Sequence, residues 1–200
     1  KYYQKSLSIN IKYAPALNNL GNLELIAGNK EEALILLKKA TESDPKGYYF
    51  WGNLANAYIQ LSENIQAEDC YRKALELNPN LVNAHLNLGY ILKDLGRLKE
   101  AEESTREAIK LAPDSANAHS NLGGILKDLG NLEDAESYLR RAIQLNPDLA
   151  TSHCNLGQAL QKKGSLNQSI DSYQKAIKIN PNYHEAHYNL ANAFKEKDNL

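Results

Sequence analysis

Apolar side chains recur along this chain with the spacing of an amphipathic helix. Between Leu88 and Leu95, leucine and isoleucine stand at i, i+3, i+4 and i+7, which places them on one helix face. A second apolar stripe begins at Leu98 and stops before Pro113, because the residue ahead of a proline disfavours helix. The pattern predicts two helices of roughly 13 residues each, joined by a short turn into an antiparallel hairpin.

This hairpin pattern repeats every 34 residues. The segment from Val82 to Gly96 returns nearly unchanged from Ala116 to Gly130. A fixed period of this length is typical of stacked repeats, each of which buries its apolar face only against its neighbours. We expect a single array over residues 1–200, with full repeats at 14–47, 48–81, 82–115, 116–149 and 150–183 and partial repeats at 1–13 and 184–200. The chain has no methionine and starts inside a second helix, so we expect it to be part of a longer protein.

Small residues mark two places in each repeat. The turn between the helices has Gly28, Gly96, Gly130 or Gly164, a residue favoured where a helix ends in a left-handed conformation. Ser62 and Asp198 replace it in two repeats, and we expect looser turns there. Inside the helices, glycine, alanine or serine recurs where the two axes of a hairpin should approach closely. These positions are Gly21, Ala55, Gly89, Gly123, Gly157 and Ala191 in the first helix, and Ala33, Ala67, Ala101, Ala135 and Ser169 in the second.

One repeat combines a tryptophan, small residues, aromatic residues and a proline at characteristic places. They are Trp51, Leu54, Ala55, Tyr58, Ala67, Tyr71, Ala74 and Pro79. This combination resembles the tetratricopeptide repeat family, and the resemblance extends over essentially the whole chain. It implies an all-α fold, a right-handed α-solenoid of stacked helix-turn-helix hairpins. The first helices would line its concave face, where proteins of this family bind other proteins.

Asparagine recurs without a break at one position of the first helix. This asparagine ladder consists of Asn19, Asn53, Asn87, Asn121, Asn155 and Asn189. An asparagine amide offers one acceptor and two donors, so a row of amides complements an extended peptide backbone. The alternative is that each asparagine bridges helices inside the stack. The ladder is similar to that of O-linked N-acetylglucosamine transferases, and this resemblance implies binding of protein substrates through their backbone.

Further groove residues follow from helical spacing, because positions one turn from the ladder point the same way. The predicted set is Tyr49, Asn56, Asn83, Tyr90, Asn117, Gln158, Tyr188 and Asn192. Tyrosine joins a large apolar ring to a polar tip, so Tyr49, Tyr90 and Tyr188 are the predicted aromatic anchors. The groove is therefore expected to be polar and rich in amides.

Composition argues against several other functions. A formal net charge of −1, from 23 basic and 24 acidic residues, gives no basic surface for nucleic acid. No apolar run approaches the roughly 18 residues of a membrane span. The sequence has no phosphate loop, nucleophile elbow or carboxylate cluster, so we expect neither an enzyme nor a cofactor. Cys70 and Cys154 are expected to be reduced packing residues of a cytoplasmic protein.

Two binding chemistries can be argued against residue by residue. Histidines recur at 85, 119, 153 and 187, where another repeat has Trp51, so we interpret them as packing residues. Metal ligands must converge to about 2.0–2.1 Å from one ion, which residues a whole repeat apart cannot do. Carboxylate-clamp members of the family hold basic residues at places occupied here by Asn18, Gly52, Leu86, Ser120, Cys154 and Tyr188. A carboxylate clamp is therefore not expected.

The sequence thus predicts a scaffold that binds a peptide or an extended protein segment through the asparagine ladder. Two alternatives remain open. The chain could be the substrate-recruiting arm of a larger enzyme, of the glycosyltransferase or sulfotransferase type, whose catalytic domain lies outside this sequence. It could also be a self-assembly module that forms homo-oligomers, because neither end carries a polar capping helix.

Overall fold

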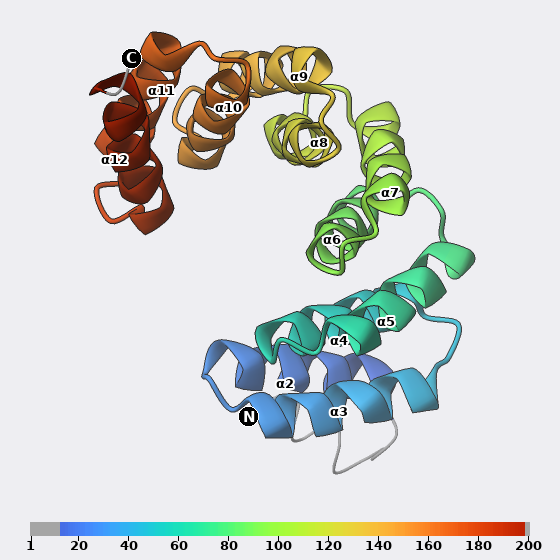
Figure 1. Ribbon diagram of the computed structural model, residues 1–200. Helices are drawn as coiled ribbons and strands as arrows, with labels where there is room; N and C mark the ends of the chain where they lie inside the picture. Colours follow the sequence, from blue (N-terminus) through green and yellow to red (C-terminus); the bar gives the residue numbers. More distant parts are fainter. Residues whose placement is uncertain (1–12, 199–200) are drawn as a thin grey trace. The chain divides into compact units, whose positions relative to one another are not determined.

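The computed structural model describes residues 13–198, which form α-helices joined by short connections (Figure 1). The all-α class is confirmed. Most of the predicted partial repeat at 1–13 and the last two residues lie outside the described part. The helices are α2 (Ala14–Ile26), α3 (Lys30–Ser43), α4 (Tyr48–Gln60), α5 (Asn64–Leu77), α6 (Val82–Asp94), α7 (Leu98–Leu111), α8 (Ala116–Asp128), α9 (Leu132–Leu145), α10 (Ala150–Lys162), α11 (Leu166–Ile179) and α12 (His184–Asp198).

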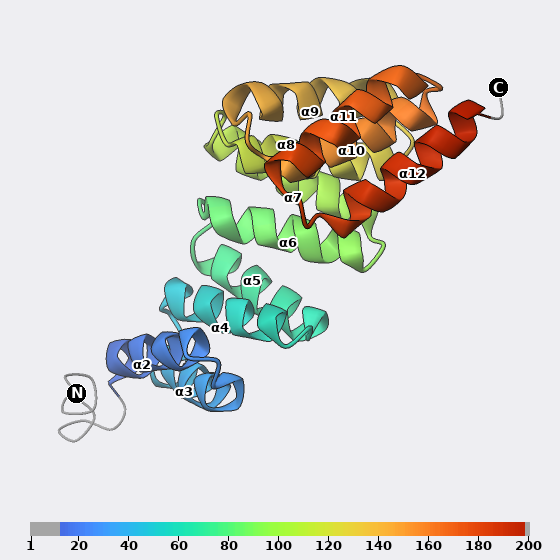
Figure 2. The same ribbon diagram turned by 90° about the vertical axis from the view of Figure 1, so that its left-hand side faces the viewer.

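The helices belong to two compact units, unit 1 up to Leu95 and unit 2 from Gly96. In unit 1, the hairpins α2–α3 and α4–α5 stack through α3 and α4, and α6 packs on α5. In unit 2, the hairpins α8–α9 and α10–α11 stack in the same way, between α7 and α12. Figure 2 shows the paired helices of the hairpin α2–α3 side by side. The prediction of a single array over residues 1–200 stays a prediction.

The second helix of each repeat ends because of the proline that follows. The residue after each of these helices takes an extended conformation, with φ of −141° at Asp44 and −145° at Asn78. Proline comes next in both cases, and its ring excludes helix from the residue before it. α7 likewise ends at Leu111, so the predicted stop before Pro113 is confirmed.

The turns inside the hairpins show one prediction to be wrong. Gly28 and Gly130 have φ of 87° and 82°, as their role at the helix end requires. Ser62 also has a positive φ of 60° instead of a looser turn. Its N–H donates to the carbonyl of Ile59, and the N–H of Glu63 donates to that of Tyr58, at 2.9 and 3.0 Å. These two bonds close the same motif as in the glycine turns, and they hold serine in glycine's conformation. Beyond Asp198, the last residue of α12, the expected turn lies outside the described residues.

Close packing explains the small residues of the first helices. A Cβ added to Gly21 would lie 2.8 Å from Cγ of Leu37, and one added to Gly123 would lie 2.5 Å from Cγ of Leu139. The alanines and the serine predicted on the second helices are fully buried. Among the small residues predicted on the first helices, Ala191 is the exception, because it is exposed on α12. In each of the hairpins of Gly21 and Gly123, a large side chain of the second helix therefore fills the space left beside a glycine of the first helix.

The repeating histidines fasten the connections between repeats. Nε1 of Trp51 donates to the carbonyl of Pro45 at 2.9 Å. Nε2 of His119 takes the same place, 2.7 Å from the carbonyl oxygen of Pro113, and the other histidines of the series do likewise. An imidazole nitrogen therefore takes the place of the indole N–H in this local contact. Among residues 13–198, no three His, Cys, Asp or Glu residues lie close enough together to hold a metal ion.

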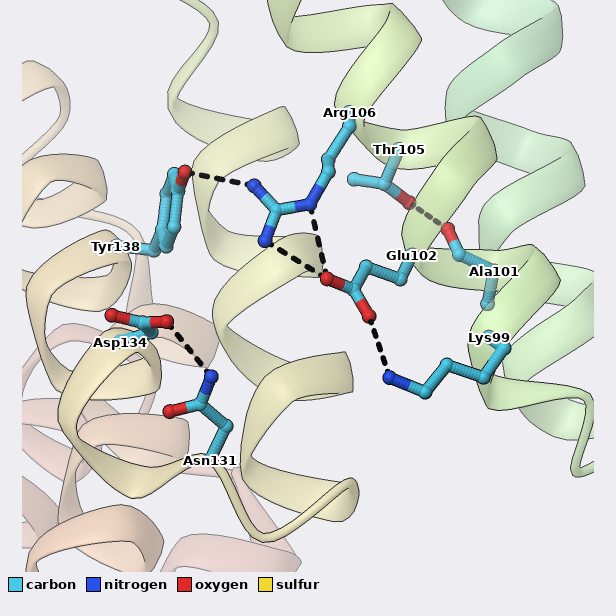
Figure 3. A network of polar contacts seen from close by, with 8 residues as sticks. All are labelled: Lys99, Ala101, Glu102, Thr105, Arg106, Asn131, Asp134 and Tyr138. Atoms are coloured by element: carbon cyan, nitrogen blue, oxygen red, sulfur yellow. Dashed lines mark hydrogen bonds and ion pairs between the residues drawn. The ribbon is translucent and has the colours of Figure 1, made fainter.

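The second helices of unit 2 carry paired surface charges. Glu102 contacts Arg106 at 2.8 Å and Lys99 at 3.6 Å along α7 (Figure 3). The guanidinium of Arg106 also donates to the hydroxyl of Tyr138 on α9, at 3.1 Å. Such exposed pairs contribute only a few tenths of a kcal/mol each, about 0.2–1. They belong to the solvated side of the hairpins.

No helix within the described part is both long and apolar enough to cross a bilayer.

Candidate functional site

The asparagine ladder of unit 1 lies on the first helices, and the amides of Asn53 and Asn87 each donate to a residue of the preceding repeat. Asn19 on α2 is exposed, whereas Asn53 on α4 and Asn87 on α6 are half-buried. Nδ2 of Asn53 donates to Oδ1 of Asn18 at 2.8 Å. Part of the bonding capacity of Asn53 is therefore used inside the stack, which favours the bridging role weighed against binding.

A buried tyrosine hydroxyl joins two of the predicted groove amides. Tyr71 on α5 donates to Oδ1 of Asn56 at 2.5 Å and accepts from Nδ2 of Asn87 at 2.8 Å. Nδ2 of Asn87 also lies 3.4 Å from Oδ1 of Asn56. Burial raises the pKa of Tyr71 to about 12, although the bond from Asn87 opposes this shift. The phenol therefore keeps its proton at neutral pH and can serve as a donor.

These amides line a cavity of about 360 Å³ that lies wholly within unit 1. It brings together predicted groove residues from α4 and α6. Two exposed rings, Tyr48 and Tyr49, stand edge to face beside it with their centroids 5.8 Å apart. Burial, followed by the charge of Asp44, raises the pKa of Tyr49. We call this cavity the amide cup; the residues that define it are Tyr48, Tyr49, Asn53, Asn56, Tyr71, Asn83 and Asn87.

The first helices of unit 2 carry a different polar arrangement. Gln158 on α10 accepts from the ammonium of Lys127 and donates to Oε1 of Glu185 at 2.7 Å, so both ends of its amide are used. Lys127 is only 7 % exposed and also lies 3.3 Å from Asp128. Nδ2 of Asn189 donates to the Cys154 sulfur at 3.9 Å. The polar side chains of this face therefore bond to one another and to charged neighbours within unit 2.

A cavity of about 610 Å³ opens beside this network. Of the predicted groove residues, it includes Gln158 and Asn189. The hydroxyl of Tyr173 donates to Oε1 of Gln161 at 2.9 Å, and the amide of Gln161 donates to Glu196 at 2.8 Å. The cavity thus has a charged lining, in contrast to the neutral amides of the amide cup.

The other predicted groove residues lie outside both cavities. Tyr90 and Tyr188 are 51 % and 68 % exposed, but neither lines a cavity described above. Asn117 and Asn192 are also exposed, whereas the ladder residues Asn121 and Asn155 are half-buried. The structure therefore gathers the predicted residues best in unit 1, at Tyr49, Asn53, Asn56, Asn83 and Asn87.

Sequence reasoning missed the part played by Tyr71 and Tyr173. Both stand on second helices, at the place where other repeats have Leu37 or Leu139, and so they read as core residues. Both rings are buried in the core, and that of Tyr173 packs against Gly157 of the first helix. A tyrosine is longer than a leucine and polar at its tip, so its hydroxyl passes through the hairpin to the groove side. In the sequence, a tyrosine on the second helix paired with a small residue on the first helix was the signal that could have revealed this role.

The cysteines are buried free thiols in the structure, as packing residues should be. Burial is the main cause that raises the pKa of Cys70 to about 12 and that of Cys154 to about 11. At neutral pH both sulfurs are therefore protonated, and they are poor nucleophiles. Neither thiol offers catalytic chemistry to the groove.

Comparisons with known proteins agree with the helical repeats. The sequence model of the family described as the cilia and flagella-associated protein 70 C-terminal domain matches residues 1–194. No curated protein sequence is similar enough to count as a relative.

Several solved structures share the fold. One is YrrB, described as a TPR protein with an unusual peptide-binding site, at a TM-score of 0.77 and 24 % identity over 94 % of this chain and 97 % of that one. A second is PilF of Pseudomonas aeruginosa, at a TM-score of 0.77 and 25 % identity over 92 % and 86 %. MamA matches at a TM-score of 0.74 and 20 % identity over 83 % and 91 %. The chain is thus a tetratricopeptide-repeat protein.

Proposed function

Because the chain belongs to the family of the cilia and flagella-associated protein 70 C-terminal domain, we propose that it is a protein-interaction module that binds an extended segment of a partner protein. The asparagine ladder and its neighbours on the first helices make the contact. The observation that carries this proposal is the amide cup, where five predicted groove residues surround one cavity of about 360 Å³.

The chemistry of the amide cup fits a peptide better than it fits other ligands. Neutral amides supply donors and acceptors without a net charge, which matches a backbone and not an anion. Tyr48 and Tyr49 add apolar ring surface for a neighbouring side chain. Packed helices stand about 8–10 Å apart, and an extended chain advances about 3.3 Å per residue, so the cup spans roughly three residues of ligand.

We propose that this module is located in a cilium or flagellum. This location is more specific than the cytoplasmic one expected from the cysteines. The support is the family's description, which names cilia and flagella. A fluorescent fusion expressed in a ciliated cell tests the placement. Enrichment along the axoneme supports it, whereas a uniform cytoplasmic signal contradicts it.

Peptide display against the purified chain tests the binding function. Selected peptides are titrated into wild type and into Asn83→Ala, whose side chain is exposed in the cup. We expect a Kd raised roughly 2- to 12-fold, the equivalent of one net hydrogen bond. Asn167→Ala is the matched control, an exposed asparagine on the second helix α11, and it should leave Kd unchanged.

If no peptide is selected, or if Asn83→Ala and Tyr49→Ala both leave Kd as it was, the amide cup does not bind peptide. The asparagines would then only bridge the stack.

A further inference from the structure

The hydroxyl of Tyr71 bonds to two amides of the cup. Tyr71 is 2 % exposed and belongs to a second helix, but its hydroxyl lies between Asn56 on α4 and Asn87 on α6. A phenol has one proton to donate. Since that proton goes to Oδ1 of Asn56, the hydroxyl can only accept from Asn87, and it does so from Nδ2.

The two amides are therefore held with opposite polarity. Oδ1 of Asn56 is engaged by Tyr71 and Asn87, so its NH₂ group is left to donate. Nδ2 of Asn87 is engaged by Tyr71 and Asn56, so its Oδ1 is left to accept. Both side chains line the same cavity. A donor and an acceptor of this kind match the carbonyl and the N–H of one peptide unit.

We propose that Tyr71 is a positioning residue that fixes Asn56 as a donor and Asn87 as an acceptor, so that the amide cup selects a peptide unit with a free N–H. A proline or another N-substituted residue at this unit is rejected, because Oδ1 of Asn87 would then lose water without gaining a donor. This proposal rests on the proposed function and adds a rule about which backbone the cup accepts.

The other described repeats lack this device. Of the places equivalent to Tyr71, two hold Leu37 and Leu139, which have no hydroxyl, and a third holds Thr105, whose hydroxyl donates to the carbonyl of Ala101 in its own helix. Tyr173 has one, but it donates to Gln161, whose NH₂ group is already bonded to Glu196. Without a fixed partner, an asparagine amide can turn over and offer either end. The selection rule therefore belongs to unit 1.

Small amides test the rule without a natural ligand. N-benzylacetamide carries one carbonyl, one N–H and one ring, which suits the tyrosines of the cup. N-benzyl-N-methylacetamide keeps the ring and the carbonyl but has no N–H. Each is titrated into the whole chain labelled with ¹⁵N-asparagine, and the side-chain amide signals of Asn56 and Asn87 report binding. We expect the N–H compound to bind roughly 2- to 12-fold more tightly.

Tyr71→Phe separates the rule from a steric effect of the extra methyl group. The ring stays and only the hydroxyl is lost, so Asn87 is no longer held as an acceptor and the preference for the N–H compound should shrink. Tyr173→Phe is the matched control, because it removes the equivalent hydroxyl of unit 2, and it should keep the wild-type preference. Should Tyr71→Phe fold poorly, Asn87→Ala removes the acceptor directly and should abolish the same preference.

Each outcome has a separate meaning. Equal binding of the two compounds to wild type overturns the rule but leaves peptide binding intact. A preference that keeps its wild-type size in both Tyr71→Phe and Asn87→Ala also overturns it. If neither compound shifts the amide signals of the cup while display-selected peptides still bind elsewhere, the cup is not the site. If nothing binds at all, the proposed function fails and the rule fails with it.

Discussion

Serine at position 62 stores conformational strain that a glycine would release. Ser62 has φ of 60°, and its side chain is exposed at the turn between α4 and α5. A left-handed conformation costs an L-residue about 1–2 kcal/mol. Glycine avoids this cost but loses more freedom on folding, about 0.5–1 kcal/mol. Ser62→Gly should therefore stabilise unit 1 by about 0.5–1 kcal/mol.

Tryptophan fluorescence during urea unfolding measures this effect. Trp51 is the chain's one tryptophan and belongs to α4, so its signal reports unit 1. With a slope near 2 kcal/mol/M, the unfolding midpoint of Ser62→Gly should rise by about 0.3–0.5 M.

The matched control is the reverse change at the equivalent turn. Gly28 has φ of 87°, and an added Cβ would meet nothing within 4 Å, so Gly28→Ser introduces strain without a clash. Its midpoint should fall by a similar amount. The reasoning is refuted if Gly28→Ser lowers the midpoint while Ser62→Gly leaves it unchanged or lowers it too.

Three further predictions concern packing, the connections and the thiols. Gly123→Ala should destabilise the chain by about 1–3 kcal/mol in thermal unfolding, because its Cβ would lie 2.5 Å from Cγ of Leu139; an unchanged melting temperature would show that the leucine moves aside freely. His119→Phe should cost about 1 kcal/mol in the same assay, because a proline carbonyl loses its donor; no loss would mean that water replaces the imidazole. Burial raises the pKa of Cys70 to about 12 and of Cys154 to about 11, so the folded state holds these protons longer than an unfolded thiol near 9.0. Their stabilisation should be complete below pH 9 and lost as the pH rises toward 11, and unfolding free energies that stay constant over this range would contradict it.

The fold could be predicted from the sequence because each level of the pattern agrees with the next. Apolar spacing, turn glycine and final proline all mark the same helix boundaries, and the period repeats them. Ser62 was predicted wrongly because residue preference was taken to decide the turn. The two backbone hydrogen bonds of the turn decide it instead, and they outweigh the preference of one serine.

The candidate site could be predicted only in part. The period identified the ladder, and helical spacing identified Asn56, Asn83 and Tyr49 beside it. Tyr71 was missed because a core position on a second helix gives no sign that its hydroxyl emerges on the other side. Tyr90 was predicted as an anchor but does not line the cup, since spacing along a helix does not specify where a neighbouring helix leaves a hollow. The enzyme-arm and self-assembly alternatives stay predictions, to be tested by the full-length sequence and by sedimentation.

Side-chain amide spectra of the ¹⁵N-asparagine-labelled chain, recorded with a display-selected peptide, test the central claim most directly. The account predicts that the signals of Asn53, Asn56, Asn83 and Asn87 shift together and saturate with a single Kd, while that of Asn167 stays in place. Saturable binding that leaves the amide cup signals unmoved would contradict it.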